Sequence, residues 1–120
     1  MPEDELKESL PPLTRERRML HRHLGRAVTD RDFRRSLLSE ALSCMVSGDV
    51  ETGKIVLREY VNGTVGFPKL GEALGRSPKS LMRMLSAAGN PQARNLFEML
   101  AYLQKAEGAV LEIRASSSAA

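Results

Sequence analysis

Apolar residues recur at steps of three and four along most of the chain, which is the spacing of one face of an α-helix. From residue 31 onward, the runs are separated by short polar or glycine-containing stretches that are typical of helix ends. The pattern therefore predicts a helix from Arg31 to the stop at Ser47-Gly48-Asp49, a helix from Val50 to Asn62-Gly63, and helices over Phe67–Leu74, Ser77–Leu85 and Ala93–Glu107.

The residues at the predicted helix ends each have a local physical role. Asp30 and Asp49 stand before helices, where their side-chain oxygens accept hydrogen bonds from free backbone amides. Gly48 follows a helix, at a position that favours glycine. These signals place the helix boundaries independently of any long-range contact.

The two ends of the chain differ from this helical middle. Residues 1–12 are polar and end in Pro11-Pro12, and we expect a loose arm there. A further helix is predicted over Thr14–Val28, with sparse apolar residues and many arginines. Val110–Arg114 alternates apolar and polar residues and favours a short strand, which a disordered tail would follow. A lone strand leaves backbone groups unpaired, so an ordered one would pair with its twin in a dimer or with a partner protein.

Composition supports an all-α fold divided into three parts. Aromatic residues make up 4% of the chain, and a core of Leu, Met, Val, Ile and Ala favours helices over sheets. The parts are an N-terminal arm with a basic helix (1–30), a helical domain (31–108), and the strand with its tail (109–120). No apolar run is long enough to span a membrane, and the acidic N-terminus lacks the features of a signal peptide. We therefore expect a cytoplasmic protein.

Few residues suggest catalysis or metal binding. Cys44 is the single cysteine, so neither an intrachain disulfide nor a cysteine-rich zinc site is expected. His21 and His23 lie two positions apart, which on a helix points them in different directions. Because no catalytic triad, carboxylate pair or phosphate-binding glycine loop is recognisable, we predict neither an enzyme nor a bound cofactor.

The stretch FPKLGEALGRSPKSLMRML favours a helix-turn-helix, two short helices joined by a tight turn containing glycine. Gly71 would allow close approach of the second helix, and Gly75 stands where a left-handed backbone is preferred. Ser77 can cap the second helix, with Pro78 at its first position. Leu81 and Leu85 would hold that helix against the core, and we expect its polar residues to face outward.

Charge agrees with a role in DNA binding. From Phe67 to Asn95 five basic residues stand against one acid, Glu72, which gives this stretch +4, whereas the whole chain carries +3. Phosphate contacts provide affinity, and residues early in the second helix read base edges. We assign Lys69, Arg76 and Arg94 to phosphates and Lys79, Ser80 and Arg83 to base edges, with Ser77 at the same end of the helix. A generic helical hairpin with an exposed basic end is the alternative.

Several of these motifs resemble the lambda-repressor-like (Xre-type) helix-turn-helix, and more narrowly the HigA-like addiction-module antidotes, which are antitoxins. The resemblance runs from about Phe33 to Gln104. It rests on LLSEAL at Leu37–Leu42, on Ser47-Gly48-Asp49, on GFPKLGEALGRSPKSLMRML, and on Gly89-Asn90-Pro91 before the last helix. The resemblance implies a five-helix core, a homodimer on a palindromic operator in double-stranded DNA, and neutralisation of a small RNA-cleaving toxin protein.

The chain departs from that family in two places. Phe67-Pro68 opens the first helix of the motif, where many repressors carry a polar phosphate-binding residue, so that contact falls to Lys69. The extra N-terminal helix has no counterpart. From Arg15 to Arg35 the chain holds eight arginines and three acids, which would contact phosphates, an acidic toxin surface or RNA, or simply form a solvated face. Two functions remain open: a DNA-binding regulator of the autorepressor type, and a toxin-neutralising interaction module with weak or no DNA binding. A third is a helical protein-interaction module that never contacts DNA.

Overall fold

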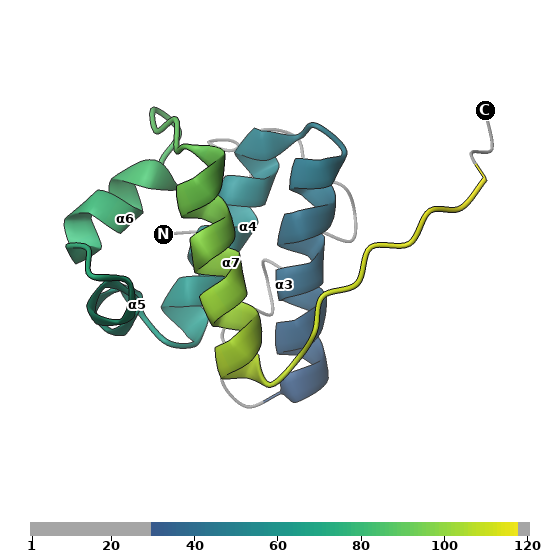
Figure 1. Cartoon of the computed structure of the whole chain (residues 1–120), viewed down its shortest axis with the longest axis horizontal. Coiled ribbons are helices and arrows are strands. Elements are labelled where there is room, and N and C mark those ends of the chain that lie inside the picture. The colour runs from purple at the N-terminus through teal and green to yellow at the C-terminus, as the bar shows by residue number, and fades with distance from the viewer. Residues whose placement is uncertain (1–29, 118–120) are drawn as a thin grey trace, which may run out of the picture.

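The computed structural model describes residues 30–117, so the predicted arm and basic helix over Thr14–Val28 lie outside the described residues. Within this part of the chain there are five α-helices and no strand (Figure 1). They are α3 (Arg31–Val46), α4 (Val50–Gly63), α5 (Phe67–Leu74), α6 (Pro78–Met84) and α7 (Ala93–Glu107). These bounds confirm the five helices predicted from residue 31 onward.

Local capping explains why the helices begin where they do. The Asp30 carboxylate accepts a hydrogen bond from the backbone N–H of Phe33 at 3.0 Å, and the Asp49 carboxylate accepts one from Thr52 at 3.3 Å. Gly48, between α3 and α4, has a φ of +94°, which other residues rarely adopt. The predicted stop and restart between these helices is therefore confirmed in its details.

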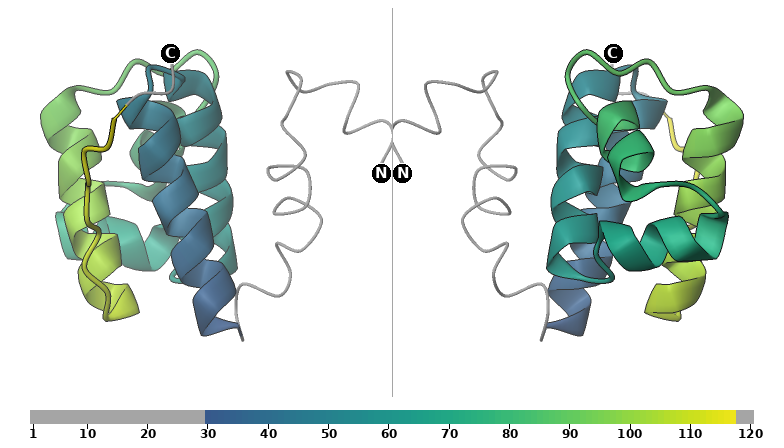
Figure 2. Two further views of the ribbon diagram at one scale, coloured as in Figure 1. Left: turned by 90° about the vertical axis from the view of Figure 1, so that its right-hand side faces the viewer. Right: turned by 90° about the vertical axis from the view of Figure 1, so that its left-hand side faces the viewer.

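One apolar core joins all five helices. α3 and α4 lie antiparallel beside each other, α7 lies along them, and α5 and α6 close the side away from the C-terminal segment (Figures 1 and 2). Burying a leucine side chain stabilises a fold by about 1.5–3 kcal/mol, so a core made largely of leucine is its main support. The core residues are Leu37, Leu38, Ala41, Val56, Leu57, Tyr60, Val61, Phe67, Leu70, Leu81, Leu85, Leu96, Met99, Leu100 and Leu103.

A polar network ties the end of α7 to α3 and α4. Glu107 has only 3% of its side chain exposed and accepts hydrogen bonds from Arg34 Nε at 3.0 Å and from the Tyr60 hydroxyl at 2.6 Å. Burial acts to raise the pKa of Glu107, but the hydrogen bonds from Arg34 and Tyr60 outweigh it and lower that pKa. Burial and the bond to Glu107 together raise the pKa of Tyr60. The carboxylate thus stays ionised inside the fold.

The prediction of a strand over Val110–Arg114 is wrong for the chain by itself. The segment is extended, as its alternating pattern predicts, but residues 30–117 contain no second strand with which it could form a ladder. It leaves the end of α7 after Gly108 and runs beside α3 (Figure 1). None of the five helices is long and apolar enough to cross a membrane.

Candidate nucleic-acid interface

A tight turn sets the relative position of α5 and α6. Residues 75–77 separate the two helices, and Gly75 is left-handed with a φ of +68°, as its position predicts. The N–H of Arg76 donates to the Gly71 carbonyl at 2.9 Å. A Cβ on Gly71 would lie 2.5 Å from the Arg76 carbonyl oxygen, so only glycine lets the turn fold back this closely. The two helices are steeply inclined to each other (Figures 1 and 2).

α6 presents an apolar face to the core and a polar face to the outside. The Ser77 hydroxyl accepts a hydrogen bond from the N–H of Ser80 at 3.1 Å and caps the helix, with Pro78 following it. Leu81 and Leu85 have 0% and 1% of their surface exposed and hold the helix against the core. On the other side of the helix, Lys79, Met82 and Arg83 are exposed. A helix held this way can enter a groove without breaking its own backbone hydrogen bonds.

The predicted site residues fall into three groups. Lys69, Lys79 and Arg83 are exposed, and their side chains form no hydrogen bond or ion pair with any described residue. Arg94 is also exposed and pairs with Glu98 at 3.3 Å, a weak surface contact that a phosphate could replace. Among the remaining three, the side chains of Arg76 and Ser77 form hydrogen bonds within the fold, whereas the Ser80 hydroxyl forms none with any described residue.

Arg76 illustrates why residue type alone does not assign a phosphate contact. Its side chain is half-buried, and one guanidinium nitrogen donates to Asn95 Oδ1 at 2.7 Å, which links the turn to the first part of α7. The Ser77 hydroxyl likewise accepts a hydrogen bond within the fold, the one that caps α6. Ser80 is half-buried. Among the predicted site residues, the exposed cations without a partner are therefore Lys69 on α5 and Lys79 and Arg83 on α6.

Lys54 supports this region, and its role was not predicted from the sequence. Only 2% of its surface is exposed. Its ammonium group donates to the carbonyls of Ser86 at 3.0 Å and Gly89 at 2.7 Å, and it pairs with Glu51 at 3.1 Å. The lysine thereby fixes the turn that follows α6 against α4. Lys54 stands three residues before Leu57, and this helical spacing places it on the buried face of α4. The same spacing could have predicted its burial from the sequence.

Two of the arginines in the basic stretch also serve the fold. Arg34 pairs with Glu107, and Arg35 donates to the carbonyl of Gly108 at 3.1 Å, so both act at the end of α7. A cation there also complements the partial negative charge of a helix C-terminus. The interpretation of this stretch as a plain solvated face therefore does not hold for these two residues. The five arginines from Arg15 to Arg26 lie outside the described residues.

No protein-family model, curated protein or solved structure matches this chain. Among the described residues, no three His, Cys, Asp or Glu side chains gather in a way that could hold a metal ion. The resemblance to antitoxin repressors is therefore an expectation from the sequence motifs alone. The structure adds to those motifs a helix pair with an open polar face.

Proposed function

We propose that this chain is a DNA-binding transcriptional regulator in which α5 and α6 form a helix-turn-helix and α6 is the recognition helix. The observation that carries the proposal is the division of α6 into a face buried through Leu81 and Leu85 and a face that exposes Lys79 and Arg83. Such a helix docks its N-terminal residues against base edges in the major groove. Its role would be binding and not catalysis.

The exposed cations would have different roles in binding DNA. Lys69, at the start of α5, is free to contact a phosphate and to position the helix pair on the backbone. Arg83 and Lys79 lie one turn apart on α6, and arginine bonds guanine in a bidentate manner. Met82 is 38% exposed on the same helix and offers an apolar contact for a thymine methyl group.

The resemblance to antidote proteins extends the proposal to an autorepressor of the antitoxin type. It would act as a homodimer whose two recognition helices lie one DNA turn apart, roughly 34–36 Å. A cognate toxin protein is a second partner implied by the same resemblance. This part of the proposal depends on the motifs quoted above and would be tested by co-purification with the product of a neighbouring gene.

The first experiment is selection of binding sites from random double-stranded DNA, followed by fluorescence anisotropy on the best site. Affinity should fall steeply between about 50 and 200 mM salt, because bound phosphates release counterions. Arg83→Ala should cost about 1–3 kcal/mol of binding free energy and relax preference at one base pair. Lys69→Ala should weaken all sequences alike and reduce the salt slope by about one.

Lys105→Ala is the matched control, since Lys105 is an exposed lysine in the last turn of α7. It should change neither affinity nor base preference. Failure to bind any duplex at low salt would reject the proposal and would favour the alternative function, a protein-interaction module. Unchanged base preference in the Arg83 variant would reject the assignment of α6 as the recognition helix.

A further inference from the structure

The extended segment after α7 carries an unused backbone edge. Among the described residues, the backbone of Val110–Arg114 makes one hydrogen bond, from the N–H of Leu111 to Gln104 Oε1 at 2.9 Å. Unpaired N–H and C=O groups in an extended conformation are a template for pairing with another strand. The segment therefore has the local geometry of an edge strand but lacks a neighbour.

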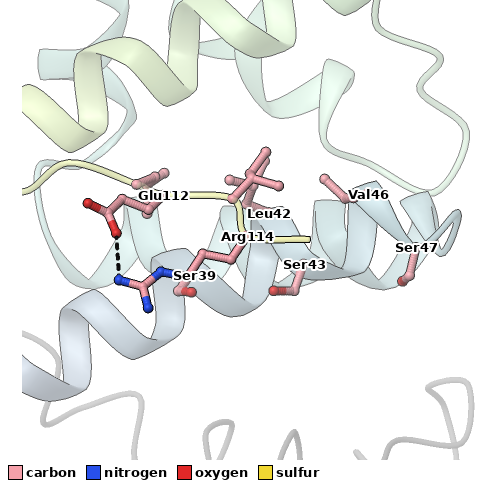
Figure 3. A pocket seen from close by; sticks show the side chains of 9 residues that line it. Ser39, Leu42, Ser43, Val46, Ser47, Glu112 and Arg114 are labelled. Carbon is pink, nitrogen blue, oxygen red and sulfur yellow. Dashed lines mark hydrogen bonds and ion pairs between the residues drawn. The ribbon is translucent and has the colours of Figure 1, made fainter. Parts of the chain in front are cut away.

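The two faces of the segment differ in character. Leu111 and Ile113 line a groove against Leu42 of α3, and Leu111 is half-buried there. Glu112 and Arg114 are exposed, also border this groove, and are joined by an ion pair of 3.3 Å (Figure 3). From Leu111 to Arg114 the residue types alternate between apolar and charged, which is the pattern of a strand with one apolar face.

The apolar face is incompletely covered. Ile113 is 71% exposed although it borders the groove. Val110, which the alternation places on the same side as Glu112 and Arg114, is 81% exposed. Phe97 on α7 and Val46 at the end of α3 also line the groove region and are 58% and 60% exposed. Large apolar side chains concentrated beside an open backbone edge indicate an interaction surface.

We propose that this segment is the dimerisation element of the protein and that its partner is the same segment of a second copy, paired antiparallel. The charges on the segment select the register. With Ile113 opposite its twin, Glu112 of each chain stands opposite Arg114 of the other, so the dimer contains two complementary pairs. Opposite charges placed directly across an antiparallel pair stabilise it.

The other registers are disfavoured by the same residues. Centring the pair on Glu112 places two glutamates opposite each other, and centring it on Arg114 does the same with two arginines, which destabilises both arrangements. Shifting the pairing by a single residue moves Ile113 to the polar face of its neighbour. A parallel, in-register arrangement would again align like charges. A two-fold axis at Leu111 avoids like charges but leaves Glu112 opposite Val110 and Arg114 opposite Gly108. The axis at Ile113 is therefore the arrangement that gives both charges a partner.

The test is sedimentation equilibrium of the full chain without DNA, using Glu112→Arg, Arg114→Glu and an equimolar mixture of these two variants. Each variant alone should weaken dimerisation by about tenfold or more, because both cross-strand pairs become repulsive. In the mixture, the two altered chains restore complementary charges to each other. The mixture should therefore form a heterodimer of near wild-type affinity.

Two further variants keep the result interpretable. Truncation after Gly108 should give a monomer, and Val50→Asp, at a residue 41% exposed in the first turn of α4, should dimerise normally. Circular dichroism would show that all variants retain their helices. A monomeric wild-type protein, full dimerisation of the single variants, or no recovery in the mixture would each overturn the proposal. Because no DNA is present, this inference and the DNA-binding proposal that it completes can fail separately.

Discussion

The two ends of the helical bundle each bury one ionised side chain, but they hold it in different ways. Glu107, at the end of α7, receives hydrogen bonds from side chains of α3 and α4. Lys54, in α4, donates to the backbone carbonyls of Ser86 and Gly89. The turn containing these carbonyls lies at the end of the bundle opposite to that of Glu107 (Figure 1).

Because of this difference, we expect Glu107 to contribute to the stability of the fold and Lys54 to the position of the turn after α6. The Glu107 network connects helices whose places are also set by the apolar core, so its loss affects stability without touching α5 or α6. Lys54 holds a loop that follows α6 directly, and a loop has few apolar contacts with which to keep its place. We therefore expect Lys54 to act on the geometry of the proposed interface and Glu107 to act mainly on stability.

The largest effect expected is on stability, from Glu107→Ala. Removing the carboxylate leaves Arg34 and Tyr60 without their buried partner and should lower the free energy of unfolding by about 3 kcal/mol. Urea denaturation would measure this loss. Glu98→Ala is the control, since Glu98 pairs with Arg94 on the surface, and it should cost no more than about 1 kcal/mol. Equal losses in the two variants would contradict the structural role of Glu107.

A smaller loss of stability but a larger loss of binding is expected for Lys54→Met. The variant leaves two turn carbonyls without their donor, which costs about 1–3 kcal/mol of unfolding free energy. Because the turn after α6 loses its tether, DNA affinity should fall further than in Glu107→Ala at a temperature where both are folded. Anisotropy measures the affinity, and Lys105→Met should leave both quantities unchanged. If Lys54→Met and Glu107→Ala bound DNA equally well, the different roles proposed for Lys54 and Glu107 would be wrong.

The smallest effect is a pH dependence at the Glu107 end. Since the folded state lowers the pKa of Glu107, its contribution is complete above the unfolded value of about 4.5 and disappears as the pH falls through the lower folded value. The stability difference between the wild type and Glu107→Gln should therefore shrink as the pH falls below about 4.5. Thermal unfolding at several pH values would measure it. A difference that is constant with pH would show that Glu107 does not titrate in this way.

Much of the fold follows from local rules that can be read along the chain. Helix starts at Asp30, Asp49 and Ser77 arise from side chains that bond backbone groups three residues away, so no distant partner is involved. Gly75 adopts its predicted left-handed conformation for an equally local reason. The exposure of Lys79 and Arg83 follows from helical spacing once Leu81 and Leu85 are taken as buried.

Tertiary structure alone decided the features that depend on residues distant in sequence. Lys54 is buried because carbonyls 32 and 35 residues away accept hydrogen bonds from its ammonium group, and Arg34 is held by a carboxylate 73 residues away. The same dependence turned Arg76 toward Asn95 and left Val110–Arg114 extended but unpaired. Spacing along the chain determines which groups share a helix face, but a buried charge or a strand also needs a partner, and that partner is supplied by the fold.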